Sequence, residues 1–349
     1  MSRLHAWAEL LRLPALFTVP GDGLAGAAAV AARPDRRTAL AVGCSLCLYE
    51  AGMALNDWAD RAEDAVERPH RPLPSGRIRP AAALAAACAL TAAGLALAAR
   101  AGRPALAVAV PLAATVWSYD LVLKRTPAGP GAMAAARGLD LLLGAAATAG
   151  TVRQALPSAA LLSTHTLAVT AVSRQETRDG TPLAPLAALA ATATLTRLLP
   201  GDLGRERRVG LVAASPSSRL RSSRGYPTRG PSGAVRATSR SYRREVPPDA
   251  APWPAPSRTP GHNGPAASLQ HFLTAALALS YAAATARPYL NAALNPSPPL
   301  TQRAVGAGIR ATIPLQAALA ARAGAGATAL GTAALTALAR RFSRRVSVT

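Results

Sequence analysis

Acidic and basic residues gather between residues 56 and 76, where two apolar segments of the chain meet. The sequence reads NDWADRAED over residues 56–64 and RPHRPLPSG over residues 68–76. Ionisable groups at a membrane boundary cost free energy, so they are usually retained where they bind a ligand or carry chemistry. The residue types in this stretch indicate a site for a metal ion and phosphate.

Asp57, Asp60 and Asp64 recur at a spacing that suits one face of a helix. At about 3.6 residues per turn, the three carboxylates fall within about 60° of one another. Their mutual repulsion favours a bound cation, and an all-oxygen donor set favours Mg²⁺ over zinc. Arg68 and Arg71 could then bind the remaining phosphate oxygens. For the acids alone, a solvated and salt-bridged helix end is the alternative.

The elements that carry this cluster are predicted to be membrane helices. The chain has 349 residues, of which 50% are hydrophobic, and a formal charge of +22. Its apolar residues, mostly Ala and Leu, form blocks of about the length of a bilayer crossing, and the charges lie between the blocks. We expect an all-α, polytopic transmembrane bundle of nine or ten spans, with no nucleic acid partner. The predicted spans are 10–32, 38–55, 81–99, 104–121, 131–151, 156–172, 182–199, 269–286, 304–321 and 324–338.

The basic residues predict the orientation of these spans. Twelve Lys and Arg residues lie near the spans on the side of the N-terminus, against six on the other side, when both sets are counted up to residue 178. Because cytoplasmic loops carry an excess of Lys and Arg, we expect a multi-pass protein of the cell membrane with its acidic loops in the cytoplasm.

Composition divides the chain into three parts. An N-terminal membrane bundle that contains both acidic motifs is expected over residues 1–200, and C-terminal membrane helices that complete it over 269–349. Between them, residues 201–268 are rich in Arg, Ser and Pro and have no periodicity that would bury a core, so we expect a long disordered loop there. Either an insertion or a locally shifted reading frame would explain this stretch.

Two later loops carry further polar residues on the same predicted side. Tyr119 is followed by Lys124 and Arg125, which could meet a phosphate; interfacial anchoring is the alternative. Glu176 and Asp179, three residues apart, could share a helical face and bind a second metal ion or tune the first. The alternative for that loop is a set of internal salt bridges with the neighbouring arginines.

These residues resemble the UbiA superfamily of intramembrane aromatic prenyltransferases. The stretch from Asn56 to Asp64 is similar to the family pattern NDxxDxxxD, and the stretch from Arg68 to Gly76 is similar to RPxRPLxSG. Tyr119, Lys124 and Arg125 look like the family's loop after the fourth helix. The resemblance covers most of residues 10–199 and, more loosely, 269–338. In the second acidic motif, Ser173 and Gly180 stand where the family has acids.

The resemblance implies a helical bundle around a cavity that opens to lipid, capped by cytoplasmic loops. It further implies Mg²⁺-dependent transfer of a prenyl group from a polyprenyl diphosphate to a membrane-accessible acceptor. The implied catalytic and metal-binding residues are Asp57, Asp60, Asp64 and Glu176. The implied substrate-binding residues are Asn56, Arg68, Arg71, Tyr119, Lys124, Arg125, Arg174 and Asp179.

Two other functions fit a chain with many spans and buried charge. One is a membrane transporter, although the sequence shows no internal repeat with paired broken helices. The other is a catalytically silent membrane protein that binds a lipid diphosphate, which the altered second acidic motif would suit. Release of diphosphate from a prenyl donor separates the enzyme from both.

Overall fold

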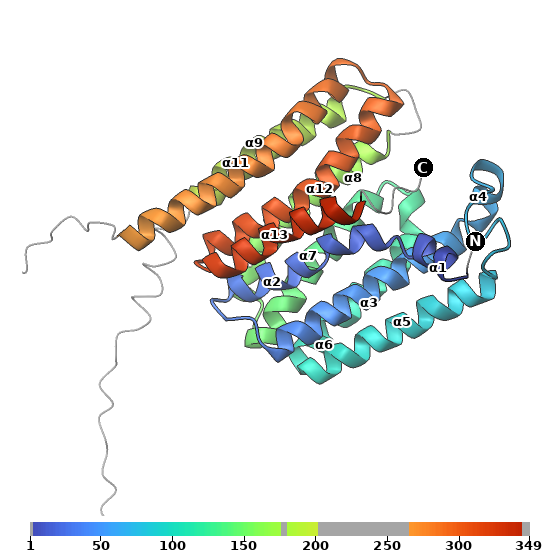
Figure 1. Cartoon of the computed structure of the whole chain (residues 1–349), viewed down its shortest axis with the longest axis horizontal. Helices are drawn as coiled ribbons and strands as arrows, with labels where there is room; N and C mark the ends of the chain where they lie inside the picture. The colour runs from blue at the N-terminus through green and yellow to red at the C-terminus, as the bar shows by residue number, and fades with distance from the viewer. Residues whose placement is uncertain (1–2, 176–179, 202–264, 344–349) are drawn as a thin grey trace, which may run out of the picture.

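The computed structural model describes residues 3–175, 180–201 and 265–343. Within these ranges every regular element is a helix, which confirms the predicted all-α fold (Figure 1). Seven of the described helical segments are long and apolar enough to cross a membrane. They are built on α3 (Arg36–Ala59), α5 (Pro80–Ala101), α6 (Arg103–Leu121), α7 (Gly129–Ala149), α8 (Leu156–Ser173), α9 (Leu183–Gly201) and α12 (Pro298–Arg322).

The other helices connect or flank these seven. They are α1 (Arg3–Leu10), η1 (Leu13–Thr18), α2 (Pro20–Ala29), α4 (Arg61–Glu67), η2 (Leu123–Arg125), η3 (Arg153–Ala155), α11 (Pro265–Leu294) and α13 (Gly326–Ser343). Most of the basic stretch predicted to be disordered, residues 202–264, lies outside the described residues.

The first predicted span, 10–32, is not one continuous helix. The backbone at Arg12 is left-handed, with φ 49°, and the short 3₁₀ helix η1 follows it. Helix α2 then starts at Pro20, whose missing N–H is tolerated in the first turn of a helix but not in a helix interior. These breaks direct the N-terminal segment back into the bundle, with Asp22 buried in the first turn of α2.

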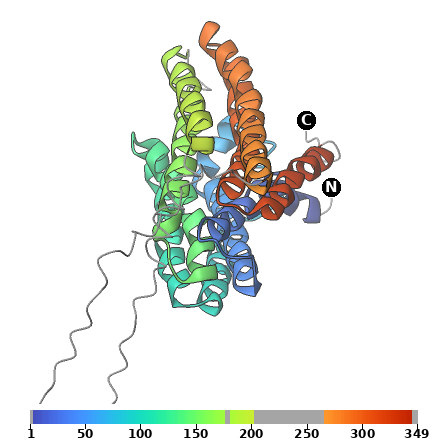
Figure 2. The ribbon, with the colours of Figure 1, turned by 90° about the vertical axis from the view of Figure 1, so that its left-hand side faces the viewer.

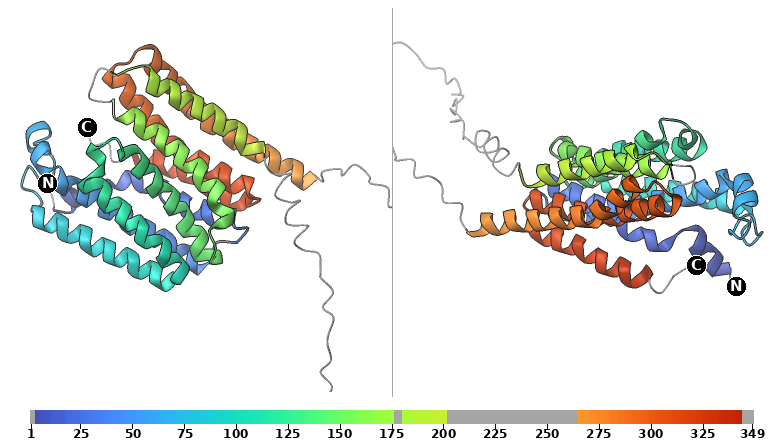
Figure 3. Two further views of the ribbon diagram at one scale, coloured as in Figure 1. Left: turned by 180° about the vertical axis from the view of Figure 1, so that it is seen from behind. Right: turned by 90° about the horizontal axis from the view of Figure 1, so that it is seen from above.

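Helices α7 and α12 are central, since each packs against several other helices. Helix α3 packs against α5, α6 and α7, and α2 lies between α7 and α12. Helices α9 and α11 run side by side, as the views from the front and from behind both show (Figures 1 and 3). Figure 2 shows this pair from the side of the molecule. Helix α4 lies at the same end of the bundle as α1 (Figure 1).

Small residues bring α2 and α7 into close contact. A Cβ atom added to Gly144 of α7 would lie 2.2 Å from the carbonyl oxygen of Gly23 in α2. Such close approach of two backbones is typical of helix packing in lipid, where apolar surface alone does not drive helices together. Glycine at position 144 thus fixes the distance between the two helices.

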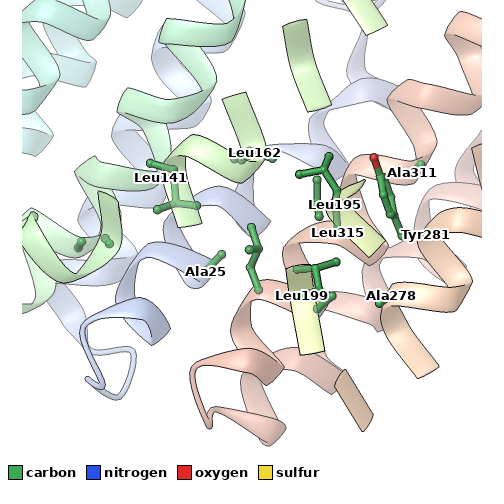
Figure 4. Close-up of a cluster of buried hydrophobic side chains, with 14 of the residues drawn as sticks. Ala25, Leu141, Leu162, Leu195, Leu199, Ala278, Tyr281, Ala311 and Leu315 are labelled. Carbon is green, nitrogen blue, oxygen red and sulfur yellow. The ribbon is translucent and has the colours of Figure 1, made fainter. Parts of the chain in front are cut away.

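The largest buried apolar cluster joins helices from both sides of the undescribed segment. Leu141 of α7, Leu162 of α8 and Leu195 of α9 meet Tyr281 of α11 and Leu315 of α12 in it (Figure 4). All five side chains are almost fully buried. The helices after residue 264 therefore belong to the same hydrophobic core as the helices before residue 202.

Candidate active site

The first acidic motif lies at a bend between two helices. Helix α3 ends at Ala59, Asp60 has φ −90° and ψ 2°, and α4 begins at Arg61. Arg61 stabilises this end, since its guanidinium donates to the carbonyl oxygen of Trp58 at 2.7 Å and stacks on the Trp58 ring. The three acids predicted to share one helical face therefore come from α3, from the bend and from α4.

Asp57 and Asp64 remain close across the bend because they share a cation. Arg71 Nη1 lies 2.8 Å from Asp64 Oδ2 and 3.7 Å from Asp57 Oδ1. Arg68 pairs with Asp64 at 3.4 Å, and Arg12 donates to Asp57 at 3.1 Å. Both carboxylates are buried, so these guanidinium groups offset the free energy that their desolvation costs.

Asp60 turns toward a different loop. Lys124 Nζ lies 2.7 Å from Asp60 Oδ1, and Arg125 Nη2 donates to the same oxygen at 3.0 Å. Arg125 also pairs with Glu63 of α4 at 3.1 Å. The loop after α6 is thus tied to the acidic motif after α3, as expected for two loops on one side of the bundle.

The third predicted loop is described only in part. Arg174 donates a hydrogen bond to the carbonyl oxygen of Thr126, which places it against the loop after α6. Glu176 and Asp179 lie outside the described residues. Their predicted roles in binding metal and substrate stay predictions.

Asp57, Asp60, Asp64 and their basic partners form the ion-pair cluster. A cavity of about 470 Å³ runs into the bundle beside this cluster. The polar end of this cavity is formed by Arg12, Asn56, Tyr119 and Asp120. Asn56 Nδ2 donates to Asp120 Oδ1 at 3.2 Å, which links α3 to α6. Deeper in, the wall is mostly apolar, with side chains such as Leu48, Met53, Leu112, Val116 and Met133.

The structure separates the predicted site residues into two groups. Asn56 and Tyr119 line the cavity. The others among the described residues lie in the ion-pair network next to the polar end or, for Arg174, against the adjoining loop. That second group comprises Asp57, Asp60, Asp64, Arg68, Arg71, Lys124, Arg125 and Arg174.

The floor of the cavity carries a second polar network that joins α2, α7 and α12. Arg137 Nη1 lies 2.7 Å from Asp22 Oδ2, and Gln316 Nε2 donates to Asp22 Oδ1 at 2.6 Å. Ser45 donates to Asp140 Oδ1. Arg137, Asp140 and Ser45 line the cavity, so its far end is polar as well.

His165 lines the cavity but has no free lone pair for proton transfer. Its Nε2 lies 3.1 Å from the carbonyl oxygen of Gly308, which can only accept, so Nε2 carries the hydrogen. Nδ1 must then accept from the hydroxyl of Tyr281, at 3.0 Å. This arrangement ties α8 to α11 and α12 and indicates a structural role.

Two residues of the polar end were not predicted as site residues. Arg12 is 44 residues from Asn56 in the sequence, and only the break before η1 turns it toward Asp57. Asp120 adjoins Tyr119 in the sequence, and this adjacency to a predicted site residue is the one signal that could have identified it.

The acidic residues fit a hard divalent cation by their chemistry. Carboxylate oxygens suit Mg²⁺, which commonly takes one or two of them and completes its octahedral shell with water and substrate phosphate. Among the described residues, no three His, Cys, Asp or Glu side chains converge on one point. Asp57 and Asp64, which Arg71 already holds close together, are the pair that fits such a shell.

Known proteins resemble the chain in both sequence and fold. Digeranylgeranylglyceryl phosphate synthase of Methanopyrus kandleri is 36% identical over 129 residues, which cover 36% of this chain and 46% of the relative. The protein of the same name from Natronomonas pharaonis is 31% identical over 182 residues, covering 52% and 66%. The chain thus spans about half the length of the curated relatives it matches.

Two solved structures share the fold. One, from work on digeranylgeranylglyceryl phosphate synthase in membranes, has a TM-score of 0.52 and 15% identity and covers 93% of this chain and 99% of its own. The other, a UbiA homologue from Aeropyrum pernix K1, has a TM-score of 0.51 and 18% identity and covers 84% and 96%. Residues 15–195, which include the first acidic motif and most of the cavity lining, match the UbiA prenyltransferase family. The chain is an integral membrane protein that belongs to the UbiA prenyltransferase family.

Proposed function

We propose that this protein transfers a prenyl group from a prenyl diphosphate to a membrane-accessible acceptor in an Mg²⁺-dependent reaction. The observation that carries the proposal is the position of the ion-pair cluster, which lies at the polar end of a cavity with apolar walls. A diphosphate needs cations, and an isoprenoid tail needs an apolar surface. The two parts of this site meet those two needs side by side.

Five basic side chains of the ion-pair cluster are proposed to bind the diphosphate. Each now pairs with a carboxylate of the first acidic motif, at distances between 2.7 and 3.4 Å. Guanidinium groups match phosphate oxygens in a bidentate geometry, and lysine meets them as a point charge. The proposed diphosphate ligands are Arg12, Arg68, Arg71, Lys124 and Arg125.

When the five basic side chains bind the diphosphate, they would release the carboxylates with which they now pair. These carboxylates would hold the metal. Asp57 and Asp64 are its proposed first ligands, with Asp60 beside them and with Glu176 and Asp179 contributed by the loop after α8. When bound, Mg²⁺ supplies neutralisation of the charge that grows on the leaving diphosphate. Tyr119 and Asn56 would position the allylic end of the donor where the cavity begins.

The apolar walls have two tasks in the proposed reaction. Leu48, Leu112 and Val116 would cover the isoprenoid chain, and by excluding water they would also protect the allylic cation from hydrolysis. We further propose a location in the cell membrane, and the excess of basic residues on one side favours an orientation in which the ion-pair cluster faces the cytoplasm. We also propose that the chain has three parts: an N-terminal membrane bundle (1–200), a basic loop (201–268) and C-terminal membrane helices (269–349).

The name of the relatives suggests the first substrates to test. Purified protein in lipid nanodiscs would receive geranylgeranyl diphosphate and Mg²⁺, with either geranylgeranylglyceryl phosphate or a substituted phenol as acceptor. We expect release of diphosphate with formation of one prenylated product, loss of both with excess chelator, and recovery on addition of Mg²⁺. Binding of the donor without any release would identify a silent lipid-diphosphate-binding protein instead.

A further inference from the structure

Asp120, at the polar end, differs from the carboxylates of the neighbouring ion-pair cluster in having no cation against it. Within the described part of the chain, no Lys or Arg nitrogen is recorded within 4.0 Å of it, whereas Asp57, Asp60 and Asp64 are all paired. Its side chain is buried, with 4% of the residue exposed, and it lines the cavity. An unpaired carboxylate is unfavourable beside a site for an anion, so its position calls for a functional reason.

The geometry leaves one oxygen of Asp120 available to a bound molecule. Oδ1 accepts the hydrogen bond from Asn56, which is the one recorded for this carboxylate among the described residues. Oδ2 lies beside Gly52, where an added Cβ atom would be 3.7 Å away. Gly52 also lines the cavity and has no side chain to cover this oxygen. The carboxylate is thus anchored by one oxygen and open at the other.

Asp120 also stands at the place where donor and acceptor must meet. Asn56 and Tyr119 flank it at the polar end, next to the proposed diphosphate site, and the apolar walls begin at Val116, one helical turn away on α6. Since the allylic carbon joins the diphosphate to the tail, it would lie at this boundary. A nucleophile that attacks this carbon would therefore lie within reach of Asp120.

We propose that Asp120 is the general base of the transfer and that the acceptor is a hydroxyl compound. This inference rests on the proposed function. The allylic C–O bond breaks and its electron pair leaves with diphosphate, while a lone pair of the acceptor oxygen forms the new C–O bond. The hydroxyl proton passes to Asp120 Oδ2. Atoms and charge balance without an oxidant or a further reactant, and Asn56 keeps the base oriented through Oδ1.

The test measures product formation and diphosphate release in the same reaction, with geranylgeranyl diphosphate as donor and either geranylgeranylglyceryl phosphate or a substituted phenol as acceptor. For Asp120→Asn we expect kcat for the prenylated product to fall by about 100-fold or more, the usual contribution of a general base. Affinity for a non-hydrolysable thiolodiphosphate analogue of the donor should change by less than about threefold, because Asp120 does not hold the diphosphate. Asp120→Ala should recover activity on addition of formate, which supplies a carboxylate in the vacated space.

Asp35→Asn is the matched control, because Asp35 caps the other end of α3 and lies outside the cavity. It should transfer at the wild-type rate. If Asp120→Asn forms product at the wild-type rate, or loses analogue affinity as steeply as it loses turnover, Asp120 is not the base. If the wild-type protein releases no diphosphate with either acceptor, the proposed function fails, and the assignment of Asp120 falls with it.

Discussion

Lys124 Nζ lies 2.7 Å from Asp60 Oδ1, so the single lysine of the chain meets the central acid of the first acidic motif. The two residues come from loops 64 positions apart, after α6 and after α3. The lysine side chain is 12% exposed and that of Asp60 is 20% exposed, so solvent screens this pair less than a surface ion pair. The contact joins the acidic motif and the basic loop into one site.

Asp60→Asn should abolish prenyl transfer without preventing membrane insertion. The substitution removes a charge from the proposed metal site and leaves Lys124 and Arg125 without their shared partner. We expect kcat/KM to fall by about 100-fold or more, as when one preorganised electrostatic group is lost. Steady-state transfer assays on protein of equal membrane content measure this.

Glu63→Gln is the control for that change. Glu63 contacts the same Arg125, but its side chain is 54% exposed, so it should transfer within about twofold of wild type. If Asp60→Asn retained full activity, the assignment of Asp60 to the metal site would be wrong.

Arg71→Gln should weaken donor binding. Arg71 holds Asp57 and Asp64 together and is proposed to bind phosphate, so the variant loses a charged hydrogen bond and a bridge. We expect the KM for geranylgeranyl diphosphate to rise by about 10-fold to 100-fold, the range for one charged hydrogen bond. Arg61→Gln, which changes an arginine that stacks on Trp58 nearby, should leave this KM unaltered. Equal KM values for the two variants would contradict the role of Arg71.

Removing one partner of the ion pair between Arg137 and Asp22 should strongly destabilise the protein. Arg137→Met leaves Asp22 buried without its cation, which we expect to lower the free energy of unfolding by about 3–5 kcal/mol. The double variant Asp22→Asn with Arg137→Met should recover part of this loss, because the uncompensated charge is gone. Denaturation in detergent, followed by circular dichroism, measures both. A double variant less stable than Arg137→Met would show that the pair is not the source of the effect.

Gly144→Ala tests the close packing of α2 against α7. The added methyl group meets the backbone of Gly23 at 2.2 Å, so we expect a loss of about 1–3 kcal/mol in unfolding free energy. Gly131→Ala lies on the same helix with nothing within 4 Å of the new Cβ atom, and should be neutral or slightly stabilising. Equal melting temperatures for the two variants would overturn the packing argument.

The membrane helices could be predicted well from the sequence, because each appears as an apolar block of about the length of a bilayer crossing. The expected span 104–121 became α6, Arg103–Leu121, and 38–55 became α3, Arg36–Ala59. The first span was less predictable, since its breaks depend on local backbone geometry at Arg12 and Pro20. A block of apolar residues does not show where a chain bends.

The partners within the site were harder to predict than its composition. The spacing of Asp57, Asp60 and Asp64 suggested one shared face, but the bend after α3 directs Asp60 to Lys124 instead. The contact of Asn56 with Asp120 depends on how α3 packs against α6, which single-sequence patterns do not contain. Local motifs therefore indicated the chemistry of the site, and tertiary packing determined which side chains take part together.

The pairing of each acid in the cluster with a basic side chain affects how the site would respond to salt. A metal-bound diphosphate would replace the existing ion pairs of the cluster with new ones. The carboxylates would then bind the metal, and the guanidinium groups would bind the phosphate oxygens. The number of close ion pairs then changes little on binding, and long-range attraction contributes little to affinity. Donor affinity should accordingly vary much less with ionic strength than the formal charge of +22 suggests.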